Sequence, residues 1–168
     1  MNTNTNTETT MTLHDPPVPV RAKLAAAWTS FMFLYIYVDY FALYKPGFID
    51  GLLAGTVHEF EIGPTFISLG LTLIAIPSMM AMLSMTLPAR INRMVNLVVA
   101  TLLIPFSAYN ATGATMTYAY FYAFSIGLEV LILAFVLRSA WNWPRVAAAP
   151  VAPATGSGAE HLRMHREV

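Results

Sequence analysis

Four long apolar runs constrain the fold of this chain more than any other feature. They cover about residues 24–44, 62–87, 91–109 and 117–137. Each run is apolar all round, whereas a helix on the surface of a soluble protein keeps a polar face. A helix needs about 20 apolar residues to cross the hydrocarbon core of a bilayer. We therefore predict an all-α fold, a bundle of four transmembrane helices.

The composition excludes several classes of protein. Charged residues make up 11% of the 168 residues, against about 25% in an average soluble domain. Nine basic residues balance nine acidic ones, so there is no basic surface for nucleic acid. The chain has no cysteine, which excludes thiolate metal sites and cysteine nucleophiles. We expect a lipid bilayer around the chain, no nucleic-acid partner, no bound metal and no cofactor.

The basic residues alternate between the loops. They lie before the first run (Arg21, Lys23), between the second and third (Arg90, Arg93) and after the fourth (Arg138, Arg145). The loop between the first two runs holds Lys45 and three acidic residues. Because Lys and Arg near span ends favour the cytoplasmic side, we predict cytoplasmic termini and a multi-pass protein of the plasma or bacterial inner membrane.

Two tails flank the predicted membrane domain. Residues 1–22 are rich in Asn and Thr at their start, and we expect a disordered N-terminal tail. The four-helix domain is predicted over residues 23–144. Residues 145–168 contain an Ala-, Pro- and Gly-rich stretch, which predicts a flexible C-terminal tail. The first run is too long for a signal peptide and carries Asp39, so it is interpreted as an uncleaved anchor.

Glu129 lies near the middle of the fourth run. An ionisable side chain there costs about 2.5–3.5 kcal/mol on insertion scales, so it faces protein or water. At 100° per residue, Tyr118, Tyr122 and Ser125 share its helix face. One interpretation is a carboxyl that binds a proton or a ligand. The other is a protonated glutamate that holds helices together by hydrogen bonds.

Asp39 is the second ionisable residue within a run. It lies nearer the end of its helix than Glu129 does, with Tyr35 one turn away. The functional hypothesis is a ligand or proton site that opens outward, with Tyr122 at about the same level. The alternative is an interfacial aspartate that reaches the headgroups within an aromatic belt.

Polar rows on the second and third runs complete the candidate interior. The third run has Asn96 and Ser107 on one face, and the second has Thr65, Ser68 and Thr72. Such rows either point inward and join helices or bond to the carbonyls of their own helix. The candidate ligand- or proton-binding residues are Glu129, Tyr122, Tyr118, Ser125, Asp39, Tyr35 and Asn96.

Short ordered motifs resemble those of a known family. In the first half they are Trp28, Tyr35-Ile36-Tyr37-Val38-Asp39, Lys45-Pro46-Gly47, Ile76-Pro77 and Leu83-Ser84. In the second half they are Asn92-Arg93, Asn96, Tyr118, Tyr120, Leu128-Glu129 and Ala140-Trp141-Asn142-Trp143. From Lys23 to Pro144 the chain resembles an uncharacterised family of small bacterial four-helix membrane proteins. It departs at Leu34, where that family usually has asparagine. The resemblance implies the topology and names no activity.

Three functional hypotheses remain open. The first is a protein that binds or transports a proton or a small amphipathic ligand inside the bundle. The second is an accessory or scaffold subunit, either a homo-oligomer or joined to another membrane subunit, with Trp28, Trp141 and Trp143 as interface anchors. The third is a quinone-linked redox protein, which rests on a distant similarity in size and span number to DoxX-like proteins. No catalytic residue is predicted, because no acid–base pair or nucleophile motif is present.

Overall fold

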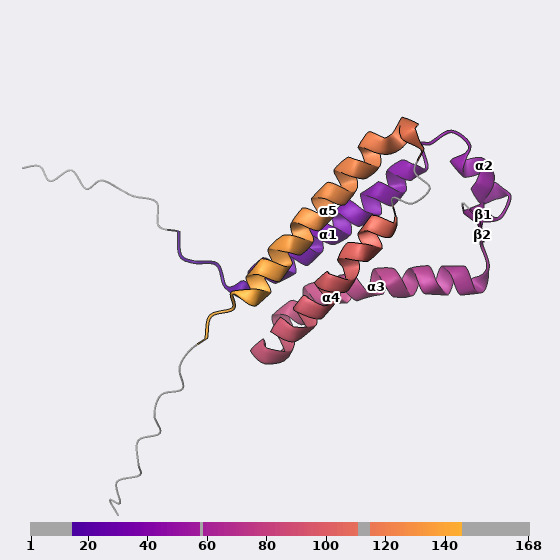
Figure 1. Ribbon diagram of the computed structural model, residues 1–168. Helices are drawn as coiled ribbons and strands as arrows, with labels where there is room; N and C mark the ends of the chain where they lie inside the picture. The colour runs from indigo at the N-terminus through magenta and orange to yellow at the C-terminus, as the bar shows by residue number, and fades with distance from the viewer. Residues whose placement is uncertain (1–14, 58, 111–114, 146–168) are drawn as a thin grey trace, which may run out of the picture.

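The computed structural model describes residues 15–57, 59–110 and 115–145. Four long helices follow one another, namely α1 (Val20–Ala42), α3 (Pro64–Thr86), α4 (Ala89–Tyr109) and α5 (Ala119–Trp141). All four predicted runs are thus confirmed as helices (Figure 1). The predicted C-terminal tail lies outside the described residues except for its first residue. The predicted N-terminal tail overlaps α1, because the helix begins directly after Pro19.

A proline marks the start of three of the four long helices. Pro19 and Pro88 are the residues before α1 and α4, and Pro64 is the first residue of α3. Proline suits these places because the first helical N–H groups have no partner within the helix. At 21 to 23 residues, each helix is long enough for a hydrocarbon core about 30 Å thick.

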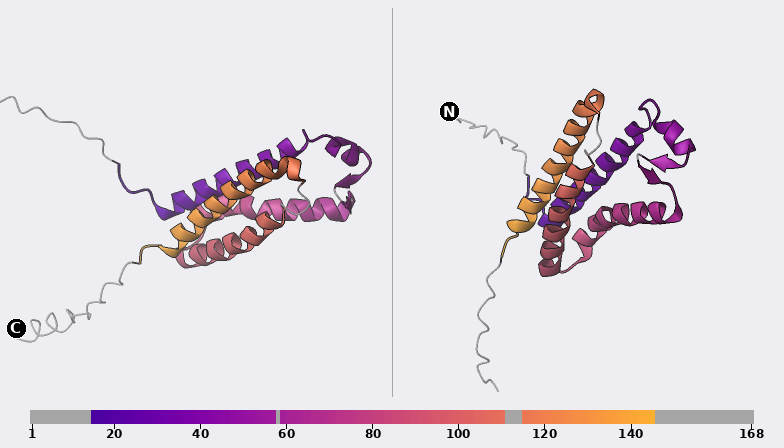
Figure 2. Two further views of the ribbon diagram at one scale, coloured as in Figure 1. Left: turned by 45° about the horizontal axis from the view of Figure 1, so that its top comes forward. Right: turned by 45° about the vertical axis from the view of Figure 1, so that its right-hand side comes forward.

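The helices are not packed as a symmetric bundle. α5 packs against both α1 and α4, and α3 packs chiefly against α1. Figures 1 and 2 show α3 diverging from the other three helices with distance from the α3–α4 hairpin. The buried core lies toward that hairpin and includes Leu24, Trp28, Phe31, Met80, Leu133 and Val136. The half of the molecule farther from the hairpin is therefore the more open one.

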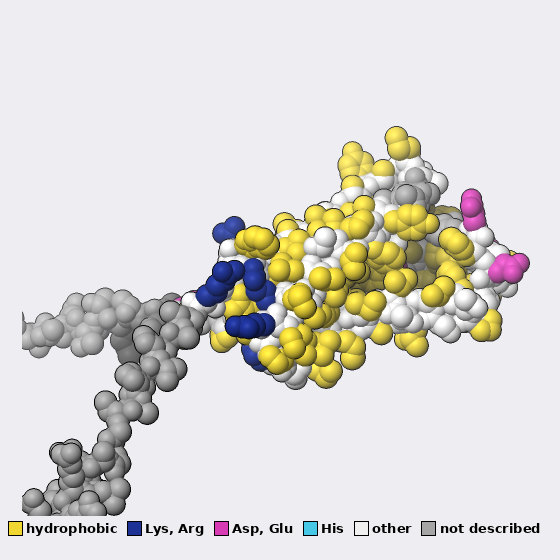
Figure 3. Space-filling model, turned by 60° about the horizontal axis from the view of Figure 1, so that its bottom comes forward, with side chains coloured by type: hydrophobic (Ala, Val, Ile, Leu, Met, Phe, Trp, Pro, Cys, Tyr) yellow, Lys and Arg dark blue, Asp and Glu magenta, His cyan; other side chains and the backbone are white. Residues whose placement is uncertain are grey.

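The outer surface of the helices is apolar. Leu71, Leu102 and Leu131 are each about two thirds exposed, and Figure 3 shows hydrophobic side chains over most of the visible face. A water-soluble monomer rarely exposes so large an apolar area. All four long helices have the length and hydropathy of membrane spans. The chain is a multi-pass membrane protein.

The connection between α1 and α3 has structure that the sequence analysis did not predict. It contains a six-residue helix, α2 (Phe48–Leu53), and a hairpin of β1 (Thr56–Val57) and β2 (Phe60–Glu61). Gly47, with φ of 78°, starts α2 in the left-handed conformation that glycine tolerates best. α2, β1 and β2 are too short to show a helical or strand periodicity in the sequence. α2 and the hairpin cover one end of the molecule (Figure 1).

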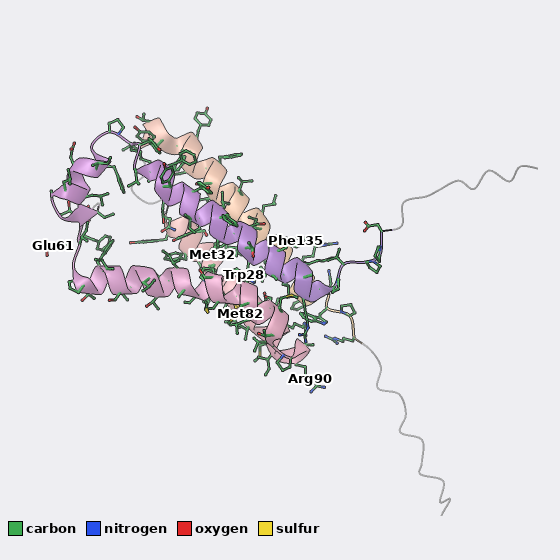
Figure 4. All side chains as sticks on the ribbon, turned by 180° about the vertical axis from the view of Figure 1, so that it is seen from behind. Trp28, Met32, Glu61, Met82, Arg90 and Phe135 are labelled. Carbon is green, nitrogen blue, oxygen red and sulfur yellow. The ribbon has the colours of Figure 1, made fainter. Side chains whose placement is uncertain are left out.

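Charge distinguishes the two ends of the molecule. Figure 4 labels Glu61 and Arg90 at opposite ends, and Figure 3 shows Lys and Arg gathered away from Asp and Glu. We call the end with α2 and the β1–β2 hairpin the acidic end, and the end with the α3–α4 hairpin the basic end. At the basic end, Arg21 Nη1 donates to Met85 O at 2.9 Å and Arg93 Nε donates to Ala140 O at 3.1 Å. These arginines satisfy carbonyls that a helix C-terminus leaves unpaired.

Candidate functional site

A cavity of about 460 Å³ lies between the helices toward the acidic end. It is lined by five of the seven candidate residues, which are Tyr35, Asp39, Tyr122, Ser125 and Glu129. The structure therefore brings together both membrane carboxyl groups and most of the polar side chains that the sequence singled out.

The packing of α1 against α5 creates this convergence. Tyr35 and Asp39 are four residues apart and share one face of α1, while Ser125 and Glu129 share one face of α5. Phe66 of α3 also lines the cavity. Phe48 and Leu52 of α2 and Val57 of β1 line it from the acidic end. The unpredicted connection is thus part of the site.

Glu129 is the most buried charged residue of the site. It lies midway along α5 and is 3% exposed. Ser107 of α4 is its hydroxyl neighbour. Among the described residues, neither Glu129 Oε2 nor Ser107 Oγ has a partner with full hydrogen-bond geometry, although the two side chains lie close enough to interact with each other. Because buried polar atoms are nearly always paired, Glu129 Oε2 has room for a further partner, which the Ser107 hydroxyl, a proton or a ligand atom could each supply.

Asp39 lies in the same cavity, closer to the acidic end. Its charged neighbours are Lys45, which attracts the carboxylate, and Glu129, with which it interacts across the cavity. Asp39 is exposed whereas Glu129 is buried, and two negative charges that share one cavity repel each other. A proton or a cationic group bound between them would relieve that repulsion.

Lys45 is a site residue that sequence reasoning missed. Its ammonium group donates a hydrogen bond to the hydroxyl of Tyr122 and lies 4.0 Å from the centroid of that ring. The ring of Phe121 is 5.0 Å from the same nitrogen and the ring of Tyr118 is 5.5 Å from it. These are cation–π distances. The available signal was its place three residues after α1, where a long side chain can fold back.

Tyr118 differs from what the helical wheel predicted, whereas Ser125 lies where it was expected but with its hydroxyl already bonded. Tyr118 lies in a 3₁₀ turn, η1 (Met116–Tyr118), before α5 begins at Ala119. It does not line the cavity with Glu129, since the 100° spacing holds only within the α-helix. Ser125 does line the cavity, but its hydroxyl donates to Tyr122 O of its own helix at 3.1 Å. Ser125 therefore contributes little unpaired polarity.

Asn96, the seventh candidate, lies in a separate polar network nearer the basic end. Its Oδ1 accepts from Trp28 Nε1 at 2.6 Å, and its Nδ2 donates to Asn92 Oδ1 at 2.7 Å. Asn92 Nδ2 in turn donates to Ser84 O at 2.5 Å. All four side chains are fully buried. We call Trp28, Ser84, Asn92 and Asn96 the asparagine network; it joins α1, α3 and α4.

This network corrects the role expected for Trp28. The sequence suggested an interface anchor, but Trp28 is fully buried and lies where α1 crosses α3 (Figure 4). A tryptophan placed inside the bundle needs a partner for its indole N–H, and Asn96 supplies it. Trp141, by contrast, is exposed, as an interface residue would be.

The polar row of the second run does not join helices. Thr65, Ser68 and Thr72 are all exposed, and Thr72 Oγ1 donates to Ser68 O at 2.8 Å. This is the alternative in which a hydroxyl bonds to its own helix. Within the described ranges, no three His, Cys, Asp or Glu side chains form a group that could hold a metal ion.

Of the comparisons with known proteins, the one with family models finds a match. No curated protein matches the chain, and no solved structure does. Residues 19–148 match the model of a family of unknown function, DUF6326, and the chain belongs to this family.

Proposed function

We propose that this protein binds a proton or a small amphipathic ligand in the cavity toward the acidic end, with Glu129 as the principal binding group. The observation that carries the proposal is the buried, unpaired Oε2 of Glu129 in a cavity shared with Asp39. We further propose a location in the plasma membrane, the inner membrane of a bacterium, with the basic end and both termini in the cytoplasm.

The size and lining of the cavity support a small-molecule ligand. Its volume of about 460 Å³ lies within the roughly 300–1,000 Å³ of typical ligand pockets. Aromatic and aliphatic side chains, including Phe66 and Phe121, form most of the wall. Most of the polar groups come from α1 and α5, and Lys45 and Asn110 add one each from the segments that follow α1 and α4. An amphipathic ligand would place its polar group at the carboxyls and its apolar part against these rings.

Proton binding uses the same residues without a further ligand. A carboxyl group within a span is a candidate proton carrier by default. Ser107 and Asp39 both interact with Glu129 and provide oxygen atoms in its surroundings. A proton held on Glu129 would also lower the cost of its burial.

The test is native mass spectrometry of the protein gently extracted from its own membrane. Glu129→Gln removes the ionisable group with almost no change in size. The matched control is Glu61→Gln, the same change on exposed β2 outside the cavity. We expect a small mass retained by the wild type and by Glu61→Gln but lost from Glu129→Gln. Retention that is equal in all three proteins would contradict a ligand role for Glu129.

A second measurement tests whether Glu129 binds a proton. Infrared spectroscopy of the reconstituted protein reports the carbonyl band of a protonated carboxyl group. We expect a band that titrates with pH in the wild type and in Glu61→Gln, and that loses amplitude in Glu129→Gln. If the small mass and the Glu129 band are both absent, the cavity carboxyl is structural and the proposal is wrong.

An accessory subunit is the second candidate function. It is favoured by the half of α3 toward the acidic end, where Ile67, Leu69 and Leu71 are exposed and the helix diverges from its neighbours. Such a face suits either a second copy of this chain or another membrane subunit. The same mass spectra discriminate, because a stoichiometric partner that is unaffected by Glu129→Gln would favour this role.

A further inference from the structure

A second concave site lies at the opposite end of the molecule from the Glu129 cavity. This hollow, of about 680 Å³, is formed by the first two turns of α4 and by the segment that follows α5. Arg90, Arg93 and Arg145 line it, together with Trp143. Its described lining contains no acidic residue. We call it the arginine pocket.

The face that α4 presents to the pocket changes from charged to apolar. Arg90, Arg93 and Leu97 lie at i, i+3 and i+7, so they share one helix face. Met94, four residues after Arg90, is exposed beside them. Seven residues of helix rise about 10 Å. The pocket therefore combines cationic groups at the end of the bundle with an apolar wall that runs toward the middle of the membrane.

Arg93 is held in place within this pocket. Its Nε donates to Ala140 O at 3.1 Å, and its guanidinium lies 5.7 Å from the centroid of the Trp141 ring. One side of the guanidinium is thus fixed by α5, and it is half-buried. Arg90 and Arg145, in contrast, are exposed. One fixed and two accessible arginines in the same pocket suit phosphate, which arginine binds through several N–H groups at once.

The depth of the pocket matches the headgroup region of a bilayer. It lies at the ends of two spans, and Trp141 and Trp143 are the aromatic residues that favour the membrane interface. Basic pockets between transmembrane helices at this level bind lipid headgroups. A free phosphate ion would use the arginines but not the apolar wall of Met94 and Leu97. A phospholipid uses both.

We propose that the arginine pocket is a binding site for an anionic phospholipid. The phosphate contacts Arg90, Arg93 and Arg145, and an acyl chain lies along Met94 and Leu97. The site is independent of the Glu129 cavity, since the two share no lining residue. It would hold the basic end in a leaflet that contains anionic lipid.

The test uses phosphatidylglycerol and phosphatidylcholine with identical acyl chains, added in equal amounts to the delipidated protein in neutral detergent. Native mass spectrometry then counts each lipid bound. The test variant is R90Q/R145Q, which removes two exposed charges and leaves the contacts of Arg93 in place. The matched control is K23Q/R138Q, which removes two exposed charges of the basic end that do not line the pocket.

The wild type and K23Q/R138Q are expected to prefer phosphatidylglycerol. In R90Q/R145Q that preference should fall by roughly tenfold, because each basic residue near an anionic headgroup strengthens binding several-fold. Equal binding of the two lipids by the wild type would overturn the proposal. So would an equal loss in both variants, which would indicate a diffuse charge effect. Displacement of the lipid by millimolar inorganic phosphate would assign the site to a free anion instead.

Discussion

Replacement of Asn96 by leucine tests the asparagine network most directly. Leucine is close to asparagine in size but has no polar atom. In Asn96→Leu the indole N–H of Trp28 and the Oδ1 of Asn92 both lose short hydrogen bonds, of 2.6 Å and 2.7 Å, and the Ser84 hydroxyl loses only weaker contacts of 3.4–3.5 Å. Both groups lie on fully buried side chains, so water does not replace the lost bonds.

The expected cost follows from the number of stranded groups. A buried polar group left unpaired costs about 1–3 kcal/mol, whereas hydrogen bonds between membrane helices average only about 0.6 kcal/mol. With two stranded groups, we expect Asn96→Leu to lower the free energy of unfolding by about 2–4 kcal/mol. In the double variant Trp28→Phe/Asn96→Leu no indole N–H remains to be stranded. Its loss should be smaller than the sum of the two single losses by about 1 kcal/mol.

The assay is unfolding by SDS in mixed micelles, followed by circular dichroism, with the two single variants and the double variant compared as a cycle. The control is Thr72→Val, which removes an exposed hydroxyl that bonds only to its own helix and should change stability by less than about 0.5 kcal/mol. The reasoning fails if Asn96→Leu is as stable as Thr72→Val, or if the two single losses simply add.

Three further predictions use other parts of the molecule. Gly47→Ala should lower the free energy of unfolding by about 1 kcal/mol in the same assay, because φ is 78° there. The control Gly70→Ala lies in the interior of α3 with open space around it and should be neutral or stabilising. Equal effects of the two changes would contradict the backbone argument. Lys45→Met should lower the free energy of unfolding by about 1–2 kcal/mol, because the contacts with Tyr122 and Phe121 are lost. Lys45→Arg should keep most of the wild-type stability. If Lys45→Arg is as unstable as Lys45→Met, the cation–π contribution is wrong. Because the chain has no cysteine, Glu61→Cys and Ala89→Cys each introduce a single labelling site. An impermeant maleimide added to intact cells should label Glu61→Cys and not Ala89→Cys. The reverse pattern would mean that the orientation is opposite to the one proposed.

The four spans could be predicted because their signal is local. Length and uniform hydropathy within one run are enough to identify a membrane helix, and the structure has helices at all four places. The connection that contains α2 and the hairpin could not be predicted in this way. A six-residue helix and two-residue strands have too few residues for a period, and they depend on Gly47 and Gly55 at positive φ.

The site was predictable within each helix but not between helices. A 100° spacing correctly put Ser125 with Glu129 and Tyr35 with Asp39. No spacing says that α1 packs against α5, and that contact is what brings the two pairs into one cavity. The same limit explains Asn96 and Lys45. Asn96 shares a helix face with Ser107, yet its partners are Trp28 of α1, Ser84 of α3 and Asn92 of its own helix. Lys45 reaches Tyr122 through the fold alone.

The asparagine network and the Glu129 cavity differ in how completely their polar atoms are hydrogen-bonded. Toward the basic end, the asparagine network pairs its amides with a tryptophan, a serine and a backbone carbonyl, and the core around it is fully buried. Toward the acidic end, the carboxyl oxygen Oε2 of Glu129 lines a cavity and has no partner of full hydrogen-bond geometry in the described structure. A polar group kept unpaired inside a membrane protein has a cost that stability alone does not explain. Since the asparagine network already joins α1, α3 and α4, helix association does not depend on Glu129 alone, and the incomplete pairing of its carboxyl supports the binding role that we propose.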